Sequence, residues 1–292
     1  MKAPLIILCP MRSFSSVVCA LLGVHPQLYG LPELNLFIAD DVDALLKLHE
    51  RRPHGVHGLL RTLAQLHDGE QTDATIDAAR AWLEQHRQWT TKRVFDHLLD
   101  LIGDRIAVDK SPRTVLRADY MARAWEMYPE ASFLHLTRHP RSTAKSLLNN
   151  IAQNADWGGT ANVDKVDPEN IWVKAHQNIV DFTDELPLGQ SMRIKGEELI
   201  SHLDHYLVQL CEWLDIDASD EALSAMKHPE TSPYACPGPD AAPLGNDPDF
   251  LANPVLRPGR VTEPSLDGEL DWAPGQHFSK PALKLARQFG YS

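Results

Sequence analysis

The sequence is poor in several features, and each absence removes a class of protein. It has only four cysteines, and their spacing suits neither disulfide pairing nor metal binding: Cys9, Cys19, Cys211 and Cys236. No apolar run approaches the roughly 20 residues of a membrane span. Met1-Lys2-Ala3 and the six residues after it are too short a stretch for a signal peptide. We therefore expect a cytoplasmic protein without a membrane span or a metal site.

Positive charge is also scarce, with 28 Lys and Arg against 40 Asp and Glu and a net charge of −12. This balance argues against binding to nucleic acid or to an anionic membrane surface. An anionic ligand would need a local cluster of basic side chains. The 292 residues, 43% of them hydrophobic, are enough for one α/β domain over 1–292. The sequence does not indicate the oligomeric state.

The first twenty-odd residues carry the clearest pattern. The apolar run 4–9 predicts a strand buried on both faces, and helical periodicity begins at Val17, after a short polar loop. This order builds an anion cradle, because the first N–H groups of a helix lack internal partners. Further donors would come from the loop side chains Arg12, Ser13, Ser15 and Ser16. The alternative without a ligand is a serine-capped core helix that follows a buried strand.

The rest of the chain alternates strands with helices. Apolar runs at 28–31, 105–109, 132–137 and 191–195 predict further strands, so we expect a parallel sheet with helices on both faces. Between about 35 and 103 helical periodicity dominates, which predicts a helical cap with helices at 35–50, 57–67, 74–86 and 91–101. From about 228 to 276 the sequence is irregular, and we interpret that stretch as a lid.

Three basic residues follow three of these strands directly: Arg12, Lys110 and Arg138. Ligands of an open parallel sheet bind beyond the carboxyl ends of its strands, so the three side chains should converge there. Each could instead form a strand-end salt bridge. Together, in an acidic protein, they indicate an anion site.

Two segments resemble the sulfotransferases that use 3′-phosphoadenosine 5′-phosphosulfate (PAPS). Pro10-Met11-Arg12-Ser13-Phe14-Ser15-Ser16, followed by His25-Pro26 and Pro32-Glu33, resembles the loop that holds the 5′-phosphosulfate. Phe14 stands where that loop usually has glycine, so either the loop differs locally or the ring packs inward. Arg138 and Ser146, eight residues apart, resemble the motif that grips the 3′-phosphate.

Weaker matches extend the resemblance. Asp109-Lys110-Ser111-Pro112 resembles an element whose lysine reaches the transferring group. In the 193–199 segment Gly196 replaces an aromatic residue of the family pattern, and Arg257-Pro258-Gly259 resembles a late 3′-phosphate element. The segment 245–250, with Trp172 and Asn178, is similar to the bacterial branch that acts on carrier-tethered polyketide chains.

The resemblance implies a P-loop-like sulfotransferase fold and transfer of a sulfuryl group from PAPS to a hydroxyl, without a metal. The acceptor would be a small molecule or a carrier-bound metabolite. The implied 5′-phosphosulfate loop comprises Arg12, Ser13, Phe14, Ser15 and Ser16. The implied 3′-phosphate residues are Arg138, Ser146 and Arg257. Lys110 and Arg12 would stabilise the transferring charge, and Glu33 would be the general base, with His57 and His67 as alternatives.

Two rival functions stay open at this point. A nucleotide-dependent kinase of a small molecule would also use a strand–loop–helix cradle, although the P-loop lysine and both of its glycines are missing. A non-catalytic nucleotide- or anion-binding module would need the cradle alone. Turnover of an acceptor would exclude the binding module. A requirement for ATP and magnesium would support the kinase.

Overall fold

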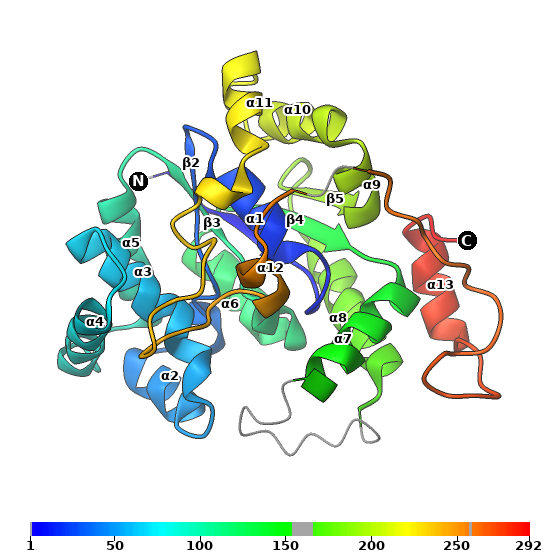
Figure 1. Ribbon diagram of the computed structural model, residues 1–292, viewed down its shortest axis with the longest axis horizontal. Coiled ribbons are helices and arrows are strands. Elements are labelled where there is room, and N and C mark those ends of the chain that lie inside the picture. Colours follow the sequence, from blue (N-terminus) through cyan, green and yellow to red (C-terminus); the bar gives the residue numbers. More distant parts are fainter. Residues whose placement is uncertain (1, 154–165, 257–258) are drawn as a thin grey trace.

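The buried apolar runs form the strands of one parallel sheet. In the computed structural model, which describes residues 2–153, 166–256 and 259–292, the described residues form a five-stranded sheet in the order β2-β3-β1-β4-β5 (Figure 1). The strands are β1 (Leu5–Leu8), β2 (Leu28–Gly30), β3 (Ile106–Asp109), β4 (Ser132–Thr137) and β5 (Ser191–Lys195). Every pairing is parallel. This confirms the predicted α/β class.

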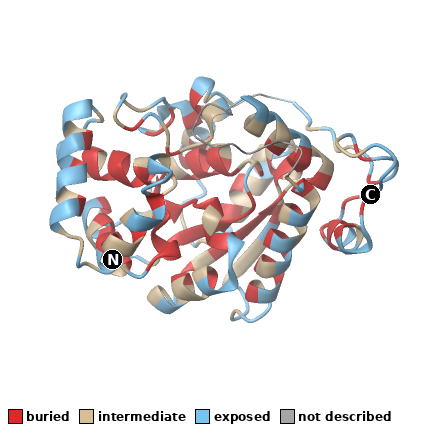
Figure 2. Cartoon of the chain, turned by 90° about the horizontal axis from the view of Figure 1, so that it is seen from below, coloured by how far each residue is buried: buried red, intermediate tan, exposed pale blue. Residues whose placement is uncertain are grey.

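The central strand β1 separates two hydrophobic cores. Because side chains alternate along a strand, Ile6 and Leu8 enter one core while Leu5 and Ile7 enter the other. All four side chains are buried. Helices cover both faces, so the sheet is the middle of three layers, and buried residues concentrate there (Figure 2). A strand with two buried faces needs the continuous apolar run found in the sequence.

Helices flank the sheet in two groups. The core on the Ile6 side is closed mainly by the helices between β2 and β4 and by α8: α2 (Val42–His49), α3 (His57–Asp68), α4 (Asp73–Gln85), α5 (Thr91–Ile102), α6 (Ala118–Met127) and α8 (Pro168–Thr183). The opposite core is closed by α1 (Ser15–Gly23), α9 (Gly196–Ser201), α10 (Leu203–Trp213) and α11 (Asp220–Met226). Two further helices, α7 (Pro140–Gln153) and α13 (Lys280–Gln288), lie on the side of β5 and α8 (Figure 1).

One predicted helix is broken in the structure. The helix expected over 35–50 is replaced by a short 3-10 turn, η1 (Leu36–Ile38), and α2. Asp41 causes the break, because it is extended, bridges to Thr90 and caps α2 by accepting a hydrogen bond from the Ala44 N–H. The segment after Pro112 is divided in a similar way, into η3 (Pro112–Leu116) and α6, with Arg117 extended between them.

The irregular stretch 228–276 contains the short elements η5 (Pro229–Thr231) and α12 (Pro248–Ala252). Its first part is tied to α3 by the fully buried Arg61, which donates hydrogen bonds to the carbonyl groups of Cys236 and Leu244. Tyr234 is buried beside it. The four cysteines are free, and only Cys236 is exposed. No helix in the described part of the chain is long and apolar enough to cross a membrane.

Candidate active site

Strand register brings three loops to one edge of the sheet. Leu8 of β1 lies opposite His135 of β4, and Ile6 lies opposite Asp109 of β3. The segments that follow β1, β3 and β4 therefore leave the sheet side by side. This places Arg12, Lys110 and Arg138 at the same carboxyl edge, as the strand-end pattern predicts.

The loop after β1 is curled by two left-handed residues. Arg12 has φ 68° and Phe14 has φ 64°, and α1 begins at the next residue, Ser15. Ser13 lies between them, and its hydroxyl is buried without a hydrogen-bond partner. The first intrahelical acceptor after the loop is the Phe14 carbonyl, which accepts from Val18. The loop thus combines helix-start N–H groups with a buried hydroxyl, a pairing that suits an anion.

Of the two alternatives expected for Phe14, the structure has the second, in which the ring packs inward. It adopts the left-handed conformation usual for glycine, and its ring packs against the core between the sheet and α9 and α10. A side chain at Gly196 would overlap Cδ2 of the Phe14 ring. The position where the family pattern has an aromatic residue is therefore filled by a ring from the loop.

Arg12 is held by acidic residues that sequence reasoning did not find. Its guanidinium forms ion pairs with Asp247, at 2.6 Å, and with Asp249, both at the start of α12 (Figure 1). The Arg12 Nε donates to the Ser146 hydroxyl at 2.9 Å. The backbone N–H of Asp247 also donates to the Ser16 hydroxyl. The guanidinium that was predicted to bind the phosphosulfate is thus paired with two carboxylates.

Lys110 joins the loop to the candidate base. Its side chain is fully buried, and its Nζ donates to the Ser16 hydroxyl at 3.1 Å and to Oε1 of Glu33 at 2.9 Å. The Glu33 side chain stays one-third exposed. Its backbone is fixed by a hydrogen bond from its N–H to the Gly245 carbonyl. A buried cation between a phosphate-type loop and a partly exposed carboxylate is an arrangement suited to group transfer.

Arg138 lies at the other end of the loop. Its Nη1 donates to the Arg12 carbonyl at 2.6 Å, and its own carbonyl accepts from Nε1 of Trp172 at 2.9 Å. The Arg138 Nε is buried without a partner, as is the hydroxyl of Thr143 on α7. Burial lowers the pKa of Arg138 from its ordinary value. The structure brings Ser146 against Arg12, whereas the sequence placed its hydroxyl beside Arg138.

The two alternative bases lie in different places. His57 begins α3, next to Gly58, where a side chain would collide with the Glu33 backbone. The His57 Nδ1 is buried without a partner, and burial lowers its pKa to about 4. His67 lies ten residues further along the helix, roughly 15 Å away. It is exposed there and hydrogen-bonded to His97.

The sequence also offers Arg257 as a contact of the 3′-phosphate. Arg257 lies outside the described residues. Arg141, at the start of α7, donates to three backbone carbonyls near the chain end, those of Ser265, Asp267 and Glu269. Arg141 therefore anchors the 265–269 segment.

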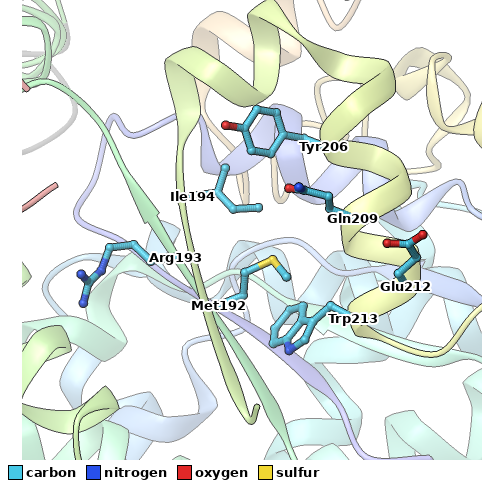
Figure 3. A pocket seen from close by; sticks show the side chains of 7 residues that line it. All are labelled: Met192, Arg193, Ile194, Tyr206, Gln209, Glu212 and Trp213. Carbon is cyan, nitrogen blue, oxygen red and sulfur yellow. The ribbon is translucent and has the colours of Figure 1, made fainter. Parts of the chain in front are cut away.

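A hollow beside the sheet lies apart from the three strand-end cations. It has a volume of about 480 Å³ and lies between β5 and α10 (Figure 3). Met192 and Ile194 point toward Tyr206 and Trp213, while Arg193 points away (Figure 3). Its lining mixes apolar and polar side chains and contains none of the strand-end cations. No group of three acidic, histidine or cysteine side chains suited to a metal occurs in the described ranges.

A buried pair of histidines is connected to the Arg138 backbone through Trp172, and sequence reasoning missed this pair. The Nε2 of His135, in β4, is hydrogen-bonded to Nδ1 of His176 at 2.9 Å, and Arg193 donates to the other His135 nitrogen. His176 packs against the Trp172 ring, whose indole N–H holds the Arg138 carbonyl. The only signal in the sequence was a histidine within an apolar strand.

A parallel α/β sheet that carries a curled loop and a lysine-bridged carboxylate at its carboxyl edge is an arrangement suited to group transfer. Residues 4–220 match the model of the Sulfotransferase family, and the chain belongs to that family. It is therefore an enzyme of sulfuryl transfer. No curated protein sequence matches the chain.

Two solved structures share this fold along the whole chain, and a third shares it along about three quarters of the chain. The sulfotransferase domain from the curacin biosynthetic pathway has a TM-score of 0.80 at 22% identity, covering 100% of this chain and 99% of that one. The sulfotransferase domain of the Synechococcus PCC 7002 olefin synthase has a TM-score of 0.77 at 22% identity, covering 100% and 97%. A Mycobacterium tuberculosis H37Rv sulfotransferase has a TM-score of 0.51 at 17% identity, covering 77% and 71%.

Proposed function

We propose that the chain transfers the sulfuryl group of PAPS to a hydroxyl of a small-molecule or carrier-bound metabolite. The observation that carries the proposal is the position of Lys110, whose ammonium contacts both the Ser16 hydroxyl of the anion loop and the Glu33 carboxylate. A single buried cation can thereby serve the transferring group and the base together.

In this proposal each residue has one role in an in-line transfer of the sulfuryl group. PAPS supplies an activated sulfuryl group on a phosphate leaving group. Ser13, Ser15, Ser16 and the loop N–H groups, including that of Phe14, would hold the 5′ end, and Arg12 would neutralise it. Glu33 would accept the proton of the acceptor hydroxyl as the new oxygen–sulfur bond forms and the old one breaks. Lys110 would stabilise the charge that spreads over the sulfuryl oxygens.

The 3′ end of the nucleotide would lie at the start of α7. Arg138 and Ser146 are our assigned contacts, and Arg257 stays a prediction from the sequence. The buried, unpartnered Nε of Arg138 and hydroxyl of Thr143 support this assignment, because such donors are costly to leave without an acceptor. A phosphate supplies acceptors for both.

The acceptor would enter beside Glu33, between the helices of the 35–103 region and the 228–276 lid. The proposal of a carrier-bound acceptor draws support from the 245–250 motif and from the two whole-chain structural matches, which come from the curacin pathway and an olefin synthase. We propose a cytoplasmic location, in agreement with the cysteine usage.

A PAPS-driven screen of hydroxyl acceptors, read by intact mass, tests the proposal. The panel should present each hydroxyl both free and as a carrier-protein thioester. We expect a product heavier by one sulfuryl group, formed only with PAPS, together with release of adenosine 3′,5′-bisphosphate. Turnover with ATP and magnesium in place of PAPS would instead support the kinase. Nucleotide binding without turnover on any acceptor would support the binding module.

A further inference from the structure

Phe14 and Gly196 form a single packing arrangement from two distant parts of the chain. Gly196, the first residue of α9, has Cδ2 of the Phe14 ring in the space where a side chain would project. That projected carbon would also lie 3.2 Å from Cε2 of the same ring and 3.2 Å from the Thr137 carbonyl. The absence of a side chain at Gly196 is therefore what allows the ring to lie there.

The backbone of Phe14 makes this arrangement informative. At φ 64° a residue with a side chain is in a conformation that favours glycine, and no glycine is used. Backbone strain at a ligand loop persists where the surrounding contacts over-determine it. The ring must therefore gain from the contacts it makes in this position.

One of those contacts is with Arg138. The guanidinium carbon lies 4.3 Å from the centroid of the Phe14 ring, within the range of a cation–π interaction. The same guanidinium is fixed through Nη1 by the Arg12 carbonyl, two residues before Phe14. The loop thus holds Arg138 by a ring on one side and a carbonyl on another, while Nε stays without a partner.

We infer that Phe14 is a positioning residue for Arg138, in a role that Gly196 makes sterically possible. The ring sets the plane of the guanidinium so that its unpartnered donor faces the 3′-phosphate monoester of the nucleotide. This inference rests on the proposed function for the identity of the ligand. It predicts that the ring matters for a nucleotide with a 3′-phosphate and not for one without it.

The test measures the affinities for adenosine 3′,5′-bisphosphate and adenosine 5′-phosphate by calorimetry. Phe14→Leu keeps apolar bulk and removes the π face. We expect it to weaken bisphosphate binding about fivefold and to leave monophosphate binding within about twofold. In an Arg138→Ala background the same substitution should change neither affinity. Equal losses for both nucleotides, or no loss for the bisphosphate, would overturn the inference.

A second pair of variants tests the shared space. Gly196→Ala should displace the ring and reproduce the selective loss of bisphosphate affinity. In the Phe14→Gly background, where the ring is absent and the backbone conformation is comfortable, Gly196→Ala should have no further effect. Additive losses would show that the two positions act independently and would contradict the arrangement.

A readout on the free protein separates this inference from the proposed function. The aromatic ring over Arg138 should shift the Nε–H resonance of that residue upfield, and Phe14→Leu should abolish the shift. If the wild-type protein binds neither nucleotide, the proposed function fails, and the resonance alone decides whether Phe14 positions Arg138. An unchanged Arg138 resonance in Phe14→Leu, with the protein folded as judged by its melting temperature, would refute it.

Discussion

The Lys110 ammonium lies 2.9 Å from Oε1 of Glu33 while the lysine side chain is entirely buried. The carboxylate it contacts is one-third exposed. A carboxylate held in this way has a fixed position, and it keeps its second oxygen for another hydrogen bond. The relationship links the candidate base to the anion loop through one side chain.

We expect Glu33→Gln to lower turnover by about 10²–10⁴ while the affinity for adenosine 3′,5′-bisphosphate barely changes. The amide keeps the shape and the hydrogen bond from Lys110 but accepts no proton at neutral pH. Steady-state kinetics beside calorimetry measures both effects, and the melting temperature controls for misfolding. His57→Gln and His67→Gln are the comparison variants. Activity within about threefold of wild type would transfer the assignment to one of these histidines.

We expect Arg138→Ala to weaken binding of the bisphosphate by about 2–4 kcal/mol, because a largely buried charge-assisted contact is lost. Arg141→Ala is a matched control from the same helix start, since that side chain holds the carbonyls of the 265–269 segment. Measured by calorimetry, the affinity of the Arg141→Ala control for the bisphosphate should stay near that of the wild type. Equal effects of the two substitutions would mean that Arg138 acts through the fold alone.

We expect Asp247→Asn to strengthen bisphosphate binding by about three- to fivefold, because its carboxylate now competes with the ligand for Arg12. Asp249→Asn should act in the same direction but less, since that side chain is more exposed. Asp240→Asn, an exposed carboxylate on the same irregular stretch, is the control. Weaker binding in the first two variants would show that the carboxylates orient Arg12 for the ligand.

We expect the free energy of unfolding to fall as the pH drops below about 6.5, partly through His135 and His176. Burial depresses the pKa of His176 to about 3 and that of His135 well below its usual value. Between these values and 6.5 the unfolded chain binds more protons than the folded chain, so acid favours unfolding. Each such group adds a slope of about 1.4 kcal/mol per pH unit.

His176→Asn tests this origin. Urea unfolding at several pH values should show a slope reduced by about one proton relative to wild type, whatever the change in absolute stability. An identical slope in the variant would assign the acid sensitivity to other groups. His57 and His139 are the next to replace, because burial lowers the pKa of each to about 4.

Sequence reasoning succeeded where one local pattern determines position. A short, largely apolar run indicates a buried strand, so β1 and β4 were predictable, and the parallel-sheet rule then placed Arg12, Lys110 and Arg138 together. It failed where the partner is remote and its surroundings lack periodicity. Asp247 and Asp249 lie in irregular sequence, and nothing local shows that they reach Arg12.

The same limit applies to Phe14. The sequence showed a ring where glycine is usual and a glycine where an aromatic residue is usual, as two separate departures. Only the three-dimensional arrangement shows that the two positions share one space. The break within 35–50 has a similar cause, because the bridge between Asp41 and Thr90 is not visible from helical periodicity.

The distribution of thiols gives the protein a built-in labelling site. Burial raises the pKa of Cys9 and Cys19 to about 12 and that of Cys211 to about 11, so these thiols stay protonated and unreactive toward electrophiles at neutral pH. Cys236 alone is exposed, on the segment that Arg61 ties to α3 and that leads to Asp247. A maleimide dye would therefore attach at a single position without any cysteine being engineered, and its emission would report events near the site.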